Sequence, residues 1–184
     1  MITTPNNKQI CPPPEYQKWV SLLDNRQALL RPIFYSDKNA ILALFERLSP
    51  ETRFLRFHYS KAKITPDELD RYCFVDYYNS FALVAEVCHE EHMEIVGVGR
   101  YVRLPCTDVA EIAFVVEDKE QGNGIGTYLI NELANLARER AVTNFVAELL
   151  NENIIMLDIL RKYDPDLKQI VDGNSLFITV PVYK

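Results

Sequence analysis

The middle of the chain limits the fold more than any other part of the sequence. Three apolar segments, at residues 81–88, 93–104 and 109–117, follow one another with only short polar turns between them. Strands joined by such short turns must be antiparallel. A helix predicted from Gly124 to about Arg140 and a strand predicted at residues 144–149 come next. This order predicts an α+β domain, with a mostly antiparallel sheet and one strand–helix–strand crossover near its centre.

The flanking segments complete the predicted domain. We expect a Pro-rich, partly ordered extension at residues 1–28, with one short helix around Tyr16 and Trp19, and a single domain over residues 29–184. The sheet is expected to have six to seven strands, with helices layered on it. The remaining helices are predicted at about residues 37–48, 49–57, 65–72 and 153–163, and the remaining strands at residues 29–34 and 175–180.

Composition argues against several functional classes. The net charge of −6 disfavours nucleic acid and anionic membranes as partners, whereas an acidic chain suits basic partners such as amines. No apolar run approaches the roughly 20 residues that span a membrane, and the N-terminus lacks the apolar core of a signal peptide. The segment His89-Glu90-Glu91-His92 reads as a polar turn, and we expect no metal site. We expect a cytoplasmic protein that is a monomer or a homodimer.

A glycine-rich loop, Gln121-Gly122-Asn123-Gly124-Ile125-Gly126, lies between a predicted strand and a predicted helix. Glycine tolerates a positive φ and lets backbone N–H groups approach an anion, and a helix N-terminus adds its positive dipole end. The loop therefore predicts a site for a diphosphate. A Walker A loop would need a lysine after Gly126, where this chain has Thr127. A dinucleotide fold would need glycine in place of Thr127, and too little chain follows Glu148 for its other strands.

The spacing Gln121-x-x-Gly124-x-Gly126 resembles the Q/R-x-x-G-x-G/A signature of the GCN5-related N-acetyltransferase (GNAT) superfamily. Within it, the chain most resembles the acetyltransferase domain of bacterial Pat-type protein lysine acetyltransferases, over roughly residues 29–182. This resemblance implies the GNAT fold and acetyl-CoA as co-substrate, with its pyrophosphate on the glycine loop. The supporting runs are residues 48–57, 75–77 and 110–116, together with Asn153, Met156 and Leu157.

The resemblance also implies which residues bind the co-substrate. The backbone of Phe114, Val115 and Val116 is expected to pair with the pantetheine arm. Asn153 is expected to contact the pantetheine or the attacking amine, although it could equally cap the helix that it begins, unless Asn151 does so. The pyrophosphate is expected on Gln121, Gly122, Asn123, Gly124, Ile125, Gly126 and Thr127.

Glu111 is the predicted catalytic base. Acetyl transfer to an amine requires that the amine lose a proton, and members of the resembling family use a Glu on this strand for that step. Glu111 lies between Ala110 and Ile112, so we expect it to be partly buried. Alternatively, Glu111 points to solvent or forms an ion pair with Arg100 or Arg103 on the neighbouring strand.

Two further features bear on the activity. The helix at residues 153–163 ends in Lys162-Tyr163-Asp164, without the glycine and aromatic residue usual in the family. Tyr163 is therefore displaced from the place where the family often has its general acid. Arg53 and Arg56, three residues apart, are interpreted as a solvated helix face.

The resemblance implies direct transfer of an acetyl group from acetyl-CoA to a primary amine, with a protein lysine as the first candidate. A small amine or an amino acid is the alternative within the same chemistry. An alternative of another class, a non-catalytic acyl-CoA sensor or interaction module, is motivated by the altered end of the last helix.

Overall fold

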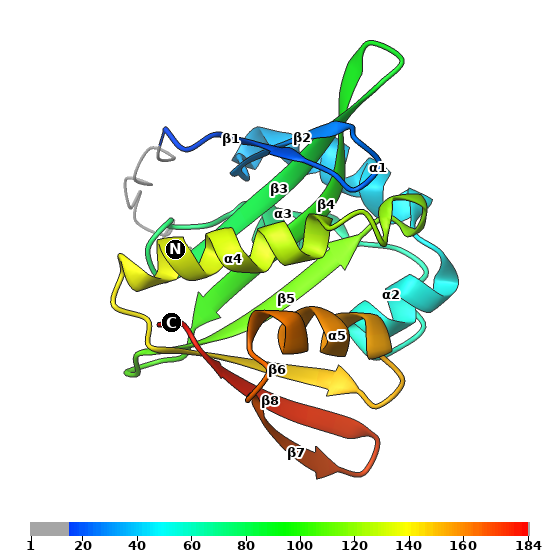
Figure 1. Cartoon of the computed structure of the whole chain (residues 1–184). Helices are drawn as coiled ribbons and strands as arrows, with labels where there is room; N and C mark the ends of the chain where they lie inside the picture. The colour runs from blue at the N-terminus through cyan, green and yellow to red at the C-terminus, as the bar shows by residue number, and fades with distance from the viewer. Residues whose placement is uncertain (1–14, 184) are drawn as a thin grey trace, which may run out of the picture.

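The computed structural model describes residues 15–183, and the Pro-rich residues 1–14 of the expected extension lie outside it. Within these residues, two strands, three α-helices and three strands are followed by a helix, a strand, a helix and two strands, which is the order of an α+β domain (Figure 1). The strands are β1 Lys18–Ser21, β2 Gln27–Pro32, β3 Ser80–His89, β4 His92–Arg103, β5 Val109–Val116, β6 Asn144–Leu150, β7 Lys168–Asp172 and β8 Ser175–Pro181. The α-helices are α1 Lys38–Arg47, α2 Pro50–Phe57, α3 Pro66–Cys73, α4 Ile125–Arg138 and α5 Ile154–Tyr163.

All the strands belong to one sheet, in the order β1-β2-β3-β4-β5-β6-β8-β7. Every neighbouring pair is antiparallel except β5 and β6, which are parallel and are joined by α4. The predicted α+β fold with a mostly antiparallel sheet and one central crossover is therefore confirmed. The sheet formed by residues 15–183 has eight strands, so the expected number of six to seven is wrong.

The sequence did not predict β1 and β7, and the reason differs for the two strands. The prediction of a short helix around Tyr16 and Trp19 is wrong. Residues 18–21 form the strand β1 instead, because they pair with β2 in a hairpin. Only Val20 of β1 is buried, while Trp19 is 58% exposed. Strand β2 runs across residues 28 and 29, where the sequence placed the start of the domain. All five residues of β7 are exposed, so this edge strand has no apolar face that a sequence pattern would reveal.

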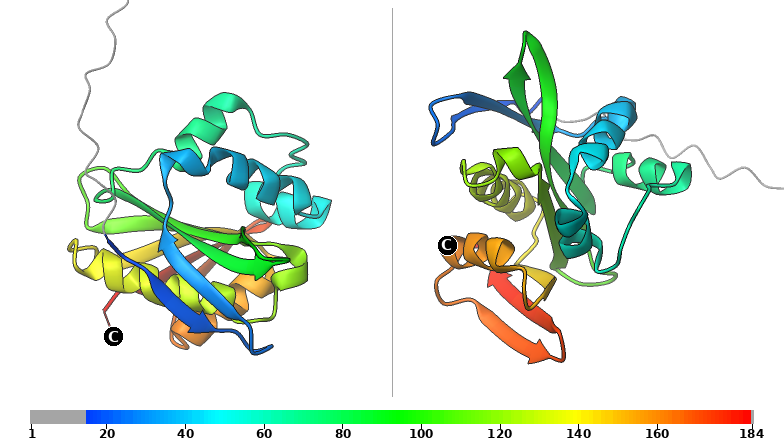
Figure 2. Two further views of the ribbon diagram at one scale, coloured as in Figure 1. Left: turned by 90° about the horizontal axis from the view of Figure 1, so that it is seen from above. Right: turned by 90° about the vertical axis from the view of Figure 1, so that its right-hand side faces the viewer.

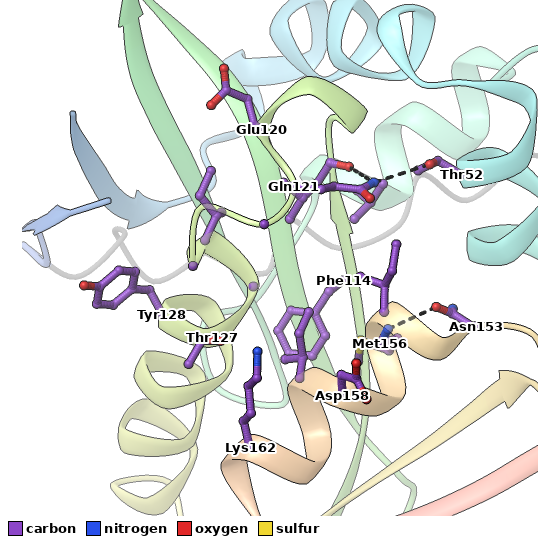
Figure 3. Close-up of a pocket in the computed structure, with 18 of the residues that line it drawn as sticks. Thr52, Phe114, Glu120, Gln121, Thr127, Tyr128, Asn153, Met156, Asp158 and Lys162 are labelled. Carbon is purple, nitrogen blue, oxygen red and sulfur yellow. Dashed lines mark hydrogen bonds between the residues drawn. The ribbon is translucent and has the colours of Figure 1, made fainter. Parts of the chain in front are cut away.

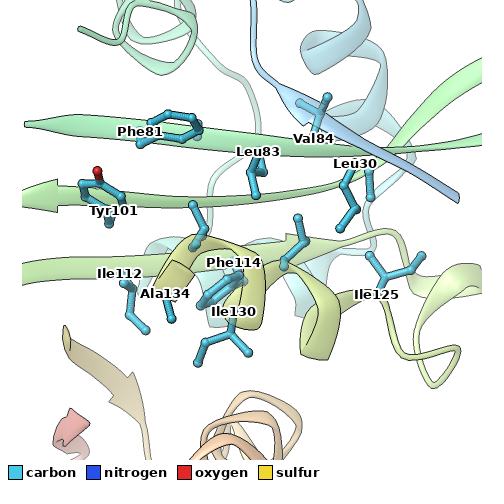
Figure 4. Close-up of a cluster of buried hydrophobic side chains, with 14 of the residues drawn as sticks. Leu30, Phe81, Leu83, Val84, Tyr101, Ile112, Phe114, Ile125, Ile130 and Ala134 are labelled. Carbon is cyan, nitrogen blue, oxygen red and sulfur yellow. The ribbon is translucent and has the colours of Figure 1, made fainter. Parts of the chain in front are cut away.

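Helices cover the sheet on both faces. Helices α1, α2 and α3 lie on one face, and α4 and α5 lie on the other (Figures 1 and 2). The main core lies between α4 and strands β3 to β5, where Phe81, Tyr101 and Ile130 are fully buried (Figure 4). None of the helices in residues 15–183 is both long enough and apolar enough to cross a membrane.

The parallel strands β5 and β6 pair only at their beginnings. Their ladder has three positions, and its last pair is Glu111 with Val146. Beyond this pair β5 continues to Val116 and β6 continues to Leu150, but no further ladder joins them. The sheet therefore opens into a wedge between the ends of these two strands.

Gly99 of β4 allows the wall of this wedge to pack closely. It pairs with Phe114 of β5, and an added Cβ would lie 2.7 Å from Cδ1 of the Phe114 ring and 3.0 Å from Cδ1 of Leu133. Both neighbours belong to the core, so they cannot move away freely.

We expect Gly99→Ala to destabilise the protein by about 1–3 kcal/mol, because overpacking a dense core forces side chains out of their preferred rotamers. Urea unfolding would measure the change in the free energy of unfolding. The matched control is Gly97→Ala on the same strand, where the nearest atom would be 3.1 Å away and the change should be smaller. Equal effects for both variants would contradict the packing explanation.

Candidate active site

A cleft of about 650 Å³ lies between the last residues of β5, the glycine loop and helix α5 (Figure 3). Helix α5 forms one wall, and residues of α2 and α4 complete the lining. The structure brings together at this cleft ten of the eleven residues expected to bind the co-substrate, and Asn123 is the one that does not line it. The ten are Phe114, Val115, Val116, Gln121, Gly122, Gly124, Ile125, Gly126, Thr127 and Asn153.

The glycine loop has the backbone geometry of an anion site. Gly122 and Gly124 have φ angles of 80° and 92°, which residues with a Cβ rarely adopt. Gly124 is the N-cap of α4, so the unpaired N–H groups of the first helical turn lie at the cleft. Gly126 has a packing role instead, because a Cβ there would lie 2.5 Å from Cδ1 of Ile159 on α5.

Three contacts hold this loop in place. The Gln121 side chain donates hydrogen bonds to the carbonyl oxygen of Val116, at 3.0 Å, and to Oγ1 of Thr52, at 3.4 Å. From the β1–β2 turn, the N–H of Leu23 donates to the carbonyl oxygen of Asn123. Gln121 thus fastens the loop to β5 and α2, and Leu23 fastens it to the N-terminal hairpin.

The acidic side chain inside the loop region is neutralised. Glu120 is 2% exposed and forms a bidentate pair with Arg26, with N···O distances of 3.1 and 2.6 Å. His89, at the turn of the β3–β4 hairpin, lies 3.3 Å from Glu120. The predicted turn at residues 89–92 is confirmed, and no group of three metal-ligating side chains occurs within residues 15–183. The buried carboxylate is therefore paired and does not repel an anion at the loop.

Asn153 caps helix α5. Its side-chain oxygen accepts a hydrogen bond from the N–H of Met156 at 3.1 Å, while the rest of the side chain faces the cleft. The suggestion that Asn151 could cap this helix is wrong, because the Asn151 side chain donates to the carbonyl oxygen of Gly173. The capping role of Asn153 leaves its amide N–H₂ group available to a ligand.

Glu111 lies at the last paired position before β5 and β6 separate. Its side chain is exposed, so the expectation of partial burial is wrong: Ala110 and Ile112 point to the buried face of β5, and Glu111 points to the opposite face. Within the described residues Glu111 forms no ion pair, and Arg103 donates instead to the carbonyl oxygens of Thr107 and Arg140. Glu111 is not among the residues that line the cleft, which on β5 are Phe114, Val115 and Val116, but its exposed carboxylate has no ion pair that would stop it from accepting a proton.

The cleft also contains residues that the sequence did not single out for it. The interpretation of Arg53 and Arg56 as one solvated face is wrong, because Arg56 lines the cleft and Arg53 donates to the carbonyl oxygen of Glu46. Spacing within α2 cannot show which of its faces lies over β5. Other lining residues are Leu23, Leu55, Tyr128, Asp158 and Lys162.

Tyr163 does not line the cleft. The side chain is 8% exposed, and its hydroxyl donates to the carbonyl oxygens of Pro181 and Val182 beside the last strand. Tyr163 therefore anchors α5 to β8, away from the reacting groups.

Comparison with known proteins identifies the class. The model of the acetyltransferase (GNAT) family matches residues 41–162, and the chain belongs to this family. An acetyltransferase of Pseudomonas aeruginosa is 30% identical over 159 residues, which cover 83% of this chain and 86% of that protein. The acetyltransferase Pat of Mycolicibacterium smegmatis is 33% identical over 132 residues, which cover 71% of this chain but only 39% of that protein.

Among solved structures, the GNAT domain of S. lividans PAT superposes with a TM-score of 0.82 at 26% identity, covering 92% of this chain and 98% of that one. The resemblance to the GNAT superfamily and to the Pat type is confirmed. The chain is an acyltransferase of the N-acetyltransferase kind, which disfavours the sensor alternative.

The residues present fit acetyl-CoA, the co-substrate typical of the family. The cleft volume is in the range of organic cofactor sites. The loop offers N–H groups where a pyrophosphate would lie, and the unpaired part of β5 offers peptide groups where a pantetheine arm could add as a strand. A Cβ at Gly122 would meet nothing within 4 Å, so space is open directly in front of the loop.

We expect Arg26→Ala to weaken CoA binding, because the loop would lose its tie to the N-terminal hairpin. Leaving the buried Glu120 carboxylate without this partner should also lower the free energy of unfolding by about 1–3 kcal/mol. Calorimetric titration with CoA and urea unfolding would measure the two effects. The control is Asp24→Ala, which removes the exposed partner of the same arginine and should change both quantities little. Unaltered CoA affinity in Arg26→Ala would argue against this anchor.

Asp118 couples helix α2 to the loop region in a pH-dependent way. Its carboxylate accepts hydrogen bonds from the Ser49 N–H, the Ser49 hydroxyl and the Thr52 hydroxyl. Burial alone would raise the pKa of Asp118, but these hydrogen bonds outweigh burial and hold the pKa below its ordinary value of 3.8.

A carboxyl whose pKa is lower in the folded state stabilises the fold above its unfolded pKa, and this contribution disappears as the pH falls through the folded pKa. The native protein should therefore exceed Asp118→Asn in melting temperature at pH 7, and the difference should shrink below about pH 4. Thermal unfolding of both proteins from pH 7 to pH 3 would test this. A difference that stays constant with pH would exclude a charge effect.

Proposed function

We propose that the protein transfers an acetyl group from acetyl-CoA directly to a primary amine. The observation that carries this proposal is the cleft between the glycine loop and the end of β5, on the part of this strand that lies beyond Glu111 and has no ladder to β6. One substrate would enter along the unpaired backbone of β5, and the amine would approach from the face that bears Glu111. Both substrates could be present together, as direct transfer requires.

The chemistry has three parts. Acetyl-CoA supplies a thioester, whose carbonyl carbon forms a bond to the amine nitrogen while its bond to sulfur breaks. Glu111 takes the proton that the amine must lose, directly or through water. Backbone N–H groups of Phe114–Val116 that point away from β4, on the side where no β6 ladder forms, stabilise the negative charge that develops on the carbonyl oxygen.

The leaving thiolate takes its proton from solvent in this proposal. Tyr163 is buried beneath β8, and the hydroxyl of Tyr128, which does line the cleft, donates to the carbonyl oxygen of Ser21. A thiol has an ordinary pKa of about 8.5, so a CoA thiolate does not require a strong acid.

The acceptor has two candidates. Similarity to the Pat proteins supports a protein lysine. A small amine or an amino acid is the second candidate, and two arginines beside the cleft, Arg56 and Arg100, favour an acceptor that carries a carboxylate. The cytoplasmic location and the state of monomer or homodimer stay predictions.

We expect Glu111→Gln to lower kcat by about 100-fold or more, because a positioned general base typically contributes that much. CoA affinity should change little, since Glu111 is not among the residues that line the cleft. Thiol release from acetyl-CoA with a panel of amines and lysine peptides would measure turnover, and calorimetry would measure CoA binding.

Glu46→Gln is the matched control, because Glu46 is an exposed carboxylate on α1 that lies outside the cleft. It should retain native turnover. If Glu111→Gln has the kcat of the native protein, Glu111 is not the catalytic base. If the native protein binds CoA but no acceptor stimulates thiol release, the proposed activity is overturned.

A further inference from the structure

Two arginines beside the cleft lack the partners that buried cations usually have. Arg56 projects from α2 and Arg100 from β4, and both are only partly exposed. Within residues 15–183 neither guanidinium has a hydrogen bond or an ion pair. Their recorded contacts are with aromatic rings: Arg56 lies 5.2 Å from the ring centre of Phe57, and Arg100 lies 5.9 Å from that of Tyr72. Arg31, by contrast, is paired with both Asp37 and Glu86.

The two positive charges are close enough to repel each other. Burial lowers the pKa of both guanidinium groups, and the charge of Arg100 lowers that of Arg56 further. The charge of Glu111 and the hydroxyl of Tyr72 act in the opposite direction on both arginines. Arginine nevertheless stays protonated in proteins, so this region holds two positive charges that an anion would stabilise.

These arginines line a small second cavity of about 60 Å³. Tyr72 is its other polar residue, and the remaining lining is apolar, including Ile33, Leu44 and Phe45. Arg56 and Val115 line both this cavity and the large cleft, so the two spaces adjoin at these residues. The volume equals roughly two water molecules, which suits a carboxylate group and is too small for a second nucleotide.

The sheet register places this cavity beside the predicted base. Glu111 pairs with Val102, and Ala113 pairs with Arg100, so Glu111 and Arg100 are diagonal neighbours on the same face of β5 and β4. Diagonal neighbours in an antiparallel pair lie roughly 7–8 Å apart, within reach of long side chains. A molecule with its amine at Glu111 could therefore place a nearby carboxylate at the arginines.

We propose that Arg56 and Arg100 form a carboxylate-binding subsite of the acyl-transfer site. The guanidinium fork matches a carboxylate in two-point hydrogen bonding. The position beside Glu111 favours the acceptor as the source of the carboxylate, as in an α-amino acid. The acyl chain of a dicarboxylic acyl-CoA is the other source of the same group. This inference rests on the proposed acetyl transfer and narrows its acceptor.

The decisive protein is the double variant Arg56→Met/Arg100→Met, compared with the native chain. Methionine keeps an unbranched apolar side chain, and removing two unpaired buried charges should not destabilise the fold. Arg71→Met is the control, because it removes one positive charge from an exposed position on neighbouring α3. Urea unfolding would establish that all three proteins are folded.

The first arm compares alanine with alaninamide as acceptors by kcat/KM. The native protein and Arg71→Met should prefer alanine, after correction for the amine protonation of each acceptor, by roughly tenfold or more. The double variant should lose this preference. The second arm compares succinyl-CoA with butyryl-CoA at a fixed amine, and an arginine-dependent preference for succinyl-CoA would assign the carboxylate to the acyl chain.

A third arm separates this inference from the proposed activity. Calorimetry would measure the binding of N-acetylalanine and N-acetylalaninamide, which requires no turnover. Arginine-dependent binding of the acid in a protein that acetylates no amine would support the subsite and overturn the activity. The proposed subsite is overturned if the native protein acetylates amines but prefers the carboxylate-bearing substrate in neither of the first two arms. It is also overturned if the double variant keeps the preference of the native protein.

Discussion

The parting of β5 from β6 after Glu111 is the constraint on which the candidate site depends. A paired sheet uses the N–H and C=O groups of both neighbouring strands, and a ligand cannot then compete for them. Here the ladder ends after three positions, although both strands continue. Peptide groups of β5 are therefore exposed inside the molecule, next to a helix N-terminus, without the instability of an open sheet edge on the outer surface.

The surroundings of the wedge keep its charges separate. Carboxylates close to the glycine loop are held by partners of their own: Glu120 by Arg26, Glu117 by Arg47, and Asp118 by hydroxyl and N–H groups of α2. An acidic chain can thereby present an anion-binding loop. Beside the second cavity the pattern reverses: among residues 15–183 neither Arg56 nor Arg100 has a carboxylate partner, and the exposed Glu111 is a diagonal neighbour of Arg100. Charge is thus neutralised where the co-substrate would bind and left uncompensated where the acceptor would bind.

Local sequence signals predicted much of the fold. The Ser49-Pro50 and Thr65-Pro66 pairs mark helix starts that the structure confirms, because N-capping depends only on neighbouring residues. The hairpin β3–β4 and the crossover β5–α4–β6 were also predicted correctly, because each is formed by segments that follow one another in the sequence. Signals that depend on distant partners failed. Tyr16, Trp19, Val20 and Leu23 have helical spacing, and only pairing with β2 makes residues 18–21 a strand.

The site shows the same division. The loop from Gln121 to Gly126 is contiguous, so its position at a helix N-terminus followed from the sequence. Asn153 was placed correctly at the start of α5, but the choice between capping and binding needed the hydrogen bond to Met156. The exposure of Glu111 and the inward direction of Arg56 depend on which helix covers which face of the sheet. No periodicity along one segment contains that information.

The contact between Arg26 and Glu120 joins residues that are 94 positions apart in the chain. Arg26 belongs to the N-terminal hairpin, and a domain boundary at residue 29 would exclude it from the domain. A shortened enzyme beginning there would retain every residue of the glycine loop and still lose the hairpin that braces it. For protein engineering, the first hairpin belongs with the glycine loop that it contacts, and a substitution in the hairpin is also a change to the surroundings of that loop.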